Sequence, residues 1–225
     1  MEPHEAQTPL FPRWTNSVAR LALGVVAASV IAIPSCLMLW VRTAYTTGSH
    51  DPRTQPLLFD HRHHVRDDGI DCRYCHDSVE KSPFAGVPAV DRCMGCHAQI
   101  WNDAPILEEL RRAAFSGAPL RWRRVHALPD HVFFDHSAHV GRGVACVVCH
   151  GRVDRMAQVY AVAPLTMGWC LDCHRDPDPW LRPVERVTEL EPPPAEASRD
   201  PRVVGRAVRV ALGVSPPTHC SGCHR

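Results

Sequence analysis

One stretch of the chain is apolar enough to cross a lipid bilayer. Residues 21–41 contain no charged side chain; Arg20 precedes them and Arg42 follows, and Trp14 and Trp40 lie near the two ends. An α-helix rises about 1.5 Å per residue, so this stretch would span about 30 Å, the hydrocarbon thickness of a bilayer. Pro34 should kink the helix near its outer end. We therefore predict one transmembrane helix over residues 18–42, the alternative being a cleaved or lipidated signal segment.

Elsewhere the pattern of hydrophobic and polar positions is short-ranged. Residues 106–114 and 202–214 have the amphipathic spacing of short helices, and Glu108 and Arg112 are one turn apart in the first of them. The Pro-rich residues 177–201 read as an extended strap, and the chain has 21 prolines in all. The predicted fold class is mostly irregular with short α-helices. Long amphipathic segments are too few to bury a large core of apolar side chains.

A Cys-x-x-Cys-His pattern occurs five times and changes this picture. The copies are Cys72–His76, Cys93–His97, Cys146–His150, Cys170–His174 and Cys220–His224. The pattern is the attachment sequence of c-type haem, in which two thiols form thioethers and the histidine becomes the proximal iron ligand. Zinc sites and disulfides also use Cys-x-x-Cys pairs, but they need no histidine after every second cysteine. We therefore expect five covalently bound haem c groups, which would form most of the core.

The expected attachment residues follow directly from the five motifs. The thioether cysteines would be Cys72, Cys75, Cys93, Cys96, Cys146, Cys149, Cys170, Cys173, Cys220 and Cys223, and the proximal ligands His76, His97, His150, His174 and His224. Of the 11 cysteines only Cys36 is left over, as a small apolar residue in the membrane stretch.

An internal repeat organises the haem-binding region. Phe-Asp-His-x-x-His-Val occurs at residues 59–65 and 134–140, and two haem motifs follow each copy. The chain therefore reads as two dihaem modules plus a fifth haem. The predicted segments are a cytoplasmic tail (1–17), a transmembrane anchor (18–42), a linker (43–57), the first dihaem module (58–120), the second dihaem module (121–182), and a Pro-rich strap with the fifth haem (183–225).

The same repeat suggests the second axial ligands. Two imidazoles one helical turn apart leave the same side of a helix, so each repeat could serve two irons. The predicted distal ligands are His61, His64, His136 and His139. For the fifth haem two alternatives remain open, His126 and Met167. No pattern involves His50, His131 or His219.

Charge and ligand number restrict the function. The formal net charge is +1, which argues against nucleic-acid binding. Irons with two protein ligands offer no position to a substrate, so no catalytic residue is predicted and electron transfer is favoured over catalysis. A free-standing tethered shuttle and, less favoured, a multihaem oxyanion reductase are the alternatives.

Five sequence segments, in a fixed order, carry a resemblance to a known family. They are QPLLFDHRHHVRDDGIDCRYCHDSVEKSPFAGVP, CMGCHAQIW, WRRVHALPDHVFFDHSAHVGRGVACVVCHGRVDRM, MGWCLDCHRDP and CSGCHR. Over residues 55–225 the chain resembles the pentahaem cytochrome c subunit of alternative complex III, and its repeats are similar to class III and c7-type cytochromes. The resemblance implies a single-pass protein of the bacterial cytoplasmic membrane with a periplasmic haem domain. It also implies an iron–sulfur/molybdopterin-like subunit and polytopic quinol-binding subunits as partners. A monohaem cytochrome c or a terminal oxidase would be the acceptor.

Overall fold

The structure is a computed structural model in which residues 11–191 and 200–225 are described. The chain divides into two compact units, with the boundary between Thr47 and Gly48. The first unit contains helix α1 (Trp14–Trp40) and the single-turn helix α2 (Ala44–Thr47). The second unit contains every haem motif.

Helix α1 is the predicted apolar helix. It has 27 residues, contains Pro34 in its interior and buries none of its side chains, including Cys36. By length and composition it can cross a membrane. It begins at Trp14 rather than at residue 18, because no glycine or proline lies between Pro12 and residue 18 and the Thr15 amide donates to the Pro12 carbonyl at 3.1 Å. Residues 1–10 of the predicted tail lie outside the described residues.

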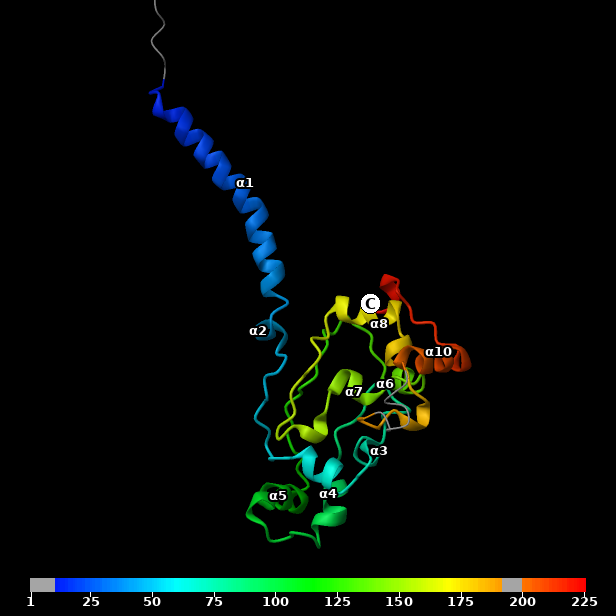
Figure 1. Cartoon of the computed structure of the whole chain (residues 1–225). Coiled ribbons are helices and arrows are strands. Elements are labelled where there is room, and N and C mark those ends of the chain that lie inside the picture. The colour runs from blue at the N-terminus through cyan, green and yellow to red at the C-terminus, as the bar shows by residue number, and fades with distance from the viewer. Residues whose placement is uncertain (1–10, 192–199) are drawn as a thin grey trace, which may run out of the picture. The chain divides into compact units, whose positions relative to one another are not determined.

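The second unit consists of short helical segments joined by loops (Figure 1). They are η1 (Arg62–Asp67), α3 (Cys72–Cys75), α4 (Val90–His97), η2 (Pro105–Leu107), α5 (Glu108–Ser116), α6 (His136–Val140), α7 (Cys146–His150), η3 (Val153–Arg155), α8 (Met167–Arg175), η4 (Asp178–Trp180), η5 (Val184–Arg186), α10 (Pro201–Leu212) and η6 (Cys220–Gly222). Over residues 11–191 and 200–225 the only β-structure is three isolated bridges. The predicted helical and irregular character is confirmed.

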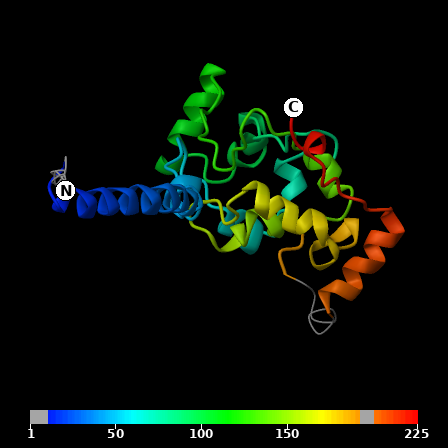
Figure 2. The ribbon, with the colours of Figure 1, turned by 90° about the horizontal axis from the view of Figure 1, so that it is seen from above.

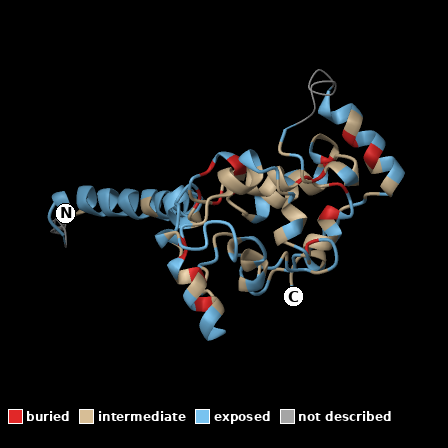
Figure 3. Ribbon diagram, turned by 90° about the horizontal axis from the view of Figure 1, so that it is seen from below, coloured by how far each residue is buried: buried red, intermediate tan, exposed pale blue. Residues whose placement is uncertain are grey.

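Side-chain cores in this unit are small. One groups Leu57, Leu107 and Leu110, and another groups Val79, Val140 and Val187. Figure 3 shows buried residues scattered over several segments rather than gathered in one centre. A polypeptide of this length with so little apolar packing needs further apolar mass to be stable.

The two predicted amphipathic helices are present. Helix α5 covers most of residues 106–114, and Arg112 pairs with Glu108 at 2.9 Å. Helix α10 covers most of residues 202–214. The described part of the predicted extended strap contains two 3₁₀ turns instead, η4 with a proline in its first turn and η5 with Pro183 at its N-cap, positions where the fixed φ of proline is tolerated. Residues 192–199 of that strap lie outside the described residues.

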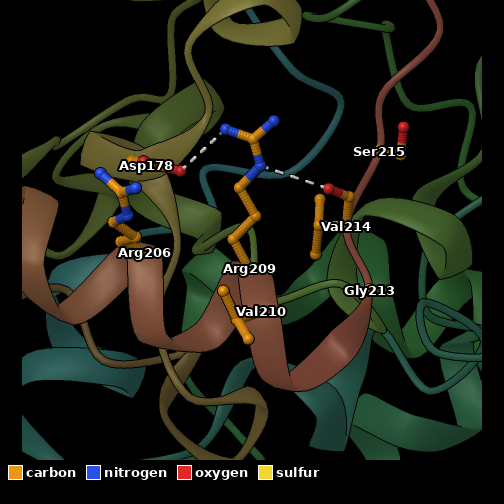
Figure 4. Close-up of a pocket in the computed structure, with 7 residues that line it drawn as sticks. All are labelled: Asp178, Arg206, Arg209, Val210, Gly213, Val214 and Ser215. Carbon is orange, nitrogen blue, oxygen red and sulfur yellow. Dashed lines mark hydrogen bonds and ion pairs between the residues drawn. The ribbon is translucent and has the colours of Figure 1, made fainter.

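Helix α10 packs closely on η4. A Cβ at Gly205 would overlap the main chain of Asp178, so only glycine permits this approach. Arg209 holds the same contact, since its guanidinium lies 3.3 Å from the Asp178 carboxylate and its Nε donates to the Val214 carbonyl at 3.4 Å (Figure 4).

We predict that Gly205→Ala displaces α10 and lowers the free energy of unfolding by about 1–3 kcal/mol. Alanine favours helices by about 1 kcal/mol over glycine, so a helix without this contact would be stabilised instead. Thermal unfolding of the haem-loaded protein measures the change. Val203→Ala, at an exposed position of the same helix, is the control and should change stability by less than about 0.5 kcal/mol.

Candidate haem-binding sites

Four of the five motifs lie on short α-helices. Helices α3 and α7 begin at the first motif cysteine, so their two cysteines are one turn apart on one side. Helices α4 and α8 carry the motif in their last turns. The fifth motif forms the 3₁₀ turn η6 instead. Asp71 caps α3 by accepting the Arg73 amide at 2.8 Å, which fixes the start of the first motif.

Six histidines donate Nδ1–H to a main-chain carbonyl, at distances of 2.7–3.1 Å. They are His64, His76, His97, His136, His139 and His174. A donor at Nδ1 sets the tautomer and leaves the Nε2 lone pair available for a metal. Three of the six are motif histidines, and the other three belong to the repeats. The donor set therefore fits haem iron.

The phenylalanine of each repeat orients both of its histidines. Phe59 meets His61 edge-on (4.7 Å between ring centres, 89° between planes) and stacks on His64 (4.6 Å, 27°). Phe134 contacts His136 (4.7 Å, 87°) and His139 (4.7 Å, 29°) in the same two ways. These contacts explain why the pattern includes a phenylalanine, because the ring fixes two imidazoles at once.

The repeats differ in length by one residue, and a π-helix absorbs the difference. His64 precedes Cys72 by eight positions, whereas His139 precedes Cys146 by seven. The first repeat forms the π-turn η1, closed by a bond from the Asp68 amide to the His63 carbonyl at 3.0 Å. A π-turn accommodates one extra residue and keeps the flanking side chains in place.

Beyond this turn the two repeats come back into register. Gly69 and Gly143 both adopt positive φ, 69° and 83°. The residue after each glycine donates its amide to the carbonyl of the second repeat histidine, at 2.9 and 3.0 Å. The repeats therefore present their histidines alike despite the different lengths.

Three histidine pairs have the spacing of two ligands on one iron. A metal–imidazole bond is about 2.0 Å and the ring centre lies about 1 Å further, so opposed ligands have centres about 6 Å apart. His64–His97 and His139–His174 are separated by 6.1 Å, and His136–His150 by 6.3 Å. Each pair joins a repeat histidine to a motif histidine.

The remaining predicted ligands are placed as follows. His61 neighbours His76, and its Nδ1 is buried without a partner. Burial lowers the pKa of His61 to about 4, so its imidazole is neutral. His126 contacts His150 at 4.4 Å, and its buried Nε2 is unpaired. Met167 begins α8 and is 66% exposed.

Sequence reasoning attached no role to His131, whose ring centre lies 5.6 Å from that of His224 with near-parallel planes. Its neighbours in sequence form no recurring pattern, so only the folded chain reveals the contact. His63, the third histidine of the first repeat, stacks on Trp101 at 5.3 Å and lies 3.6 Å from the Asp68 carboxylate.

Electrostatic interactions among the thiols link pairs of motifs. Cys146 of the third motif raises the pKa of Cys72 in the first motif. Burial raises the pKa values of Cys93, Cys149 and Cys170, and the charges of Cys75, Cys173 and Cys223, respectively, raise them further. These interactions link the second motif with the first, the first with the third, the third with the fourth, and the fourth with the fifth.

Burial also shifts the pKa values of two groups of the third motif. It lowers the pKa of His150 to about 3 and raises that of Cys149 to about 12. Among the described residues no three His, Cys, Asp or Glu side chains converge as a metal site would require, and every cysteine is free.

Comparison with known proteins agrees with the motif analysis. No family profile matches the chain. Over 110 residues it is 38% identical to the multiheme cytochrome c subunit of menaquinone reductase from Nitratidesulfovibrio vulgaris, which covers 48% of this chain. The chain spans about half the length of that relative (50%). This similarity supports a multihaem cytochrome c with covalently bound haem.

We predict that His139→Ala converts one haem from low-spin to high-spin, because the iron facing His174 loses its second imidazole. Electron paramagnetic resonance of the oxidised protein measures the high-spin fraction. His63→Ala is the control, since His63 packs on Trp101 and should leave every haem low-spin. An unchanged low-spin spectrum in His139→Ala would contradict this pairing.

Deletion of Asp68 should be tolerated, because it gives the first repeat the length of the second and converts the π-turn to an α-turn. Haem content and spin state should match those of the wild type. Deletion of Arg142 at the corresponding place in the second repeat should misalign His139 and produce high-spin haem. Equal damage from both deletions would refute the equivalence of the repeats.

Proposed function

We propose that this chain is a membrane-anchored pentahaem c-type cytochrome that carries electrons for a quinol-linked membrane complex. The observation that carries the proposal is the pairing of repeat histidines with motif histidines at 6.1–6.3 Å. Haem bound in this way supplies one-electron exchange between ferrous and ferric iron. With an imidazole on each side, no coordination position is left for a substrate.

The residues of this chain would then hold the iron-ligating imidazoles in fixed orientations. Main-chain carbonyls fix six of the imidazoles through Nδ1–H, and the repeat phenylalanines fix two rings each. Ligands restrained in this way cannot leave the iron readily when its charge changes. A rigid, closed ligand set supports electron transfer and disfavours the oxyanion reductase alternative, which needs an open iron.

Quinol binding requires partner subunits. Helix α1 can anchor the chain, but a single helix supplies too few walls for a quinol pocket. We infer that polytopic subunits bind the quinol and that an iron–sulfur/molybdopterin-like subunit completes an assembly of the alternative complex III type. The haem unit would face the periplasm of a bacterial cytoplasmic membrane, and a monohaem cytochrome c or a terminal oxidase would accept the electrons.

A second direction of transfer is a specific alternative. The similar protein from N. vulgaris is named as part of a menaquinone reductase, which passes electrons to the quinone. Both directions use the same haem-binding chain, so the partner subunits and the haem potentials decide between them.

Purification of the tagged full-length chain from mild-detergent extracts tests the proposal. We expect it to co-migrate with an iron–sulfur protein and polytopic subunits, with a mass increment of five haems. A menaquinol analogue should reduce the oxidised haems in this preparation, whereas faster oxidation of reduced haems by a menaquinone analogue would favour the reverse direction. A lone haem-stained band in several detergents would refute the complex and leave the tethered shuttle.

A further inference from the structure

The fifth motif is the one for which the repeats provide no ligand. Its histidine, His224, is one residue from the end of the sequence given. The two repeat histidines of each module are already placed near the first four motifs. A ligand for the fifth motif must therefore come from another part of the fold.

His131 is the histidine that packs against His224. Their ring centres are 5.6 Å apart and their planes differ by 19°. The separation is close to the 6.1–6.3 Å of the other three pairs, and near-parallel planes also occur in His136–His150, at 13°. The pair thus has the approximate spacing of two imidazoles that share one iron.

An antiparallel bridge made of two main-chain hydrogen bonds fixes this juxtaposition. Val132 and His224 form an antiparallel bridge. The Phe133 amide donates to the Cys223 carbonyl at 2.7 Å, and the Arg225 amide donates to the His131 carbonyl at 3.2 Å. Figure 2 shows the carboxyl-terminal turn within the same haem-binding unit as the central segments of the chain. The contact therefore does not depend on one rotamer.

A cation–π contact adds to the bridge. The Arg225 guanidinium lies 4.7 Å from the centre of the Phe133 ring, so side chains on both segments also interact. The fold thus devotes several contacts to holding residues 131–133 beside the last motif.

The two alternatives from the sequence are placed less suitably. His126 lies against His150 of the third motif, and at 4.4 Å the rings are too close for opposed ligands. Met167 is on α8, the helix that carries the fourth motif. His219 directly precedes Cys220 of the fifth motif, and no ring contact joins it to His224 among the described residues.

We propose that His131 is the second axial ligand of the haem attached at Cys220 and Cys223. With this assignment the segment from His131 to His139 would serve three haems: the fifth through His131, the third through His136 and the fourth through His139. The assignment rests on the proposed attachment of a haem at the fifth motif.

The test uses the full-length haem-loaded protein with His131→Ala. Electron paramagnetic resonance should show one high-spin haem of the five, and added imidazole should restore the low-spin signal. His131→Met should remain low-spin with a raised potential at one haem, because a thioether favours the ferrous state. His219→Ala is the matched control and should remain wholly low-spin.

Repeating the substitution in a variant without the fifth attachment site shows which haem is affected. The double variant Cys220→Ser/Cys223→Ser lacks the fifth attachment site, so adding His131→Ala to it should create no new high-spin signal. A new signal there, or a wholly low-spin His131→Ala protein with all its haems, would overturn the proposal.

Two further measurements keep the outcomes distinct. Peptide mass spectrometry reports whether the fifth motif carries haem in the wild type; its absence there would refute the haem count and this assignment together. If His131→Ala loses the fifth haem, the His131→Met potential decides: a shift at one haem supports ligation, and an unchanged set of potentials contradicts it.

Discussion

The structure depends on a simple restraint, the hydrogen bond from an imidazole Nδ1–H to a main-chain carbonyl. Six histidines make this bond; four of the acceptors lie within ten residues of their histidine, and two lie far along the chain. His136 donates to Pro83 and His174 to Pro217, so the bonds tie separate segments together. Each bond also leaves Nε2 free for iron. The same interaction therefore organises irregular backbone and prepares a ligand.

This restraint explains how a chain with small side-chain cores has a defined architecture. The buried apolar clusters are few, and the described elements are mostly single turns. In our account, the haems provide the missing apolar mass and the paired histidines connect each motif to a repeat. Electron transfer needs closely spaced, tightly held redox groups, and the interactions that link the five motifs support such an arrangement in one unit.

Much of this could be predicted from sequence because the information is local. The Cys-x-x-Cys-His spacing defines the motifs, and the repeat pairs His64 and His139 with later motifs. The π-turn was not predicted, since one extra residue can be absorbed at several points of a turn. The contact between His131 and His224 was also missed, because it depends on the path of the chain between them. The start of α1 at Trp14 was missed because polar residues continue a helix as readily as they end it.

The most direct test of the central claim is quantitative electron paramagnetic resonance of the oxidised, full-length wild-type protein, referred to its chemically measured haem content. The account predicts five haems per chain, all low-spin ferric, because each iron is held by two protein ligands. A high-spin signal equal to one haem or more in the intact protein would contradict it, since it would show an iron open to solvent or substrate.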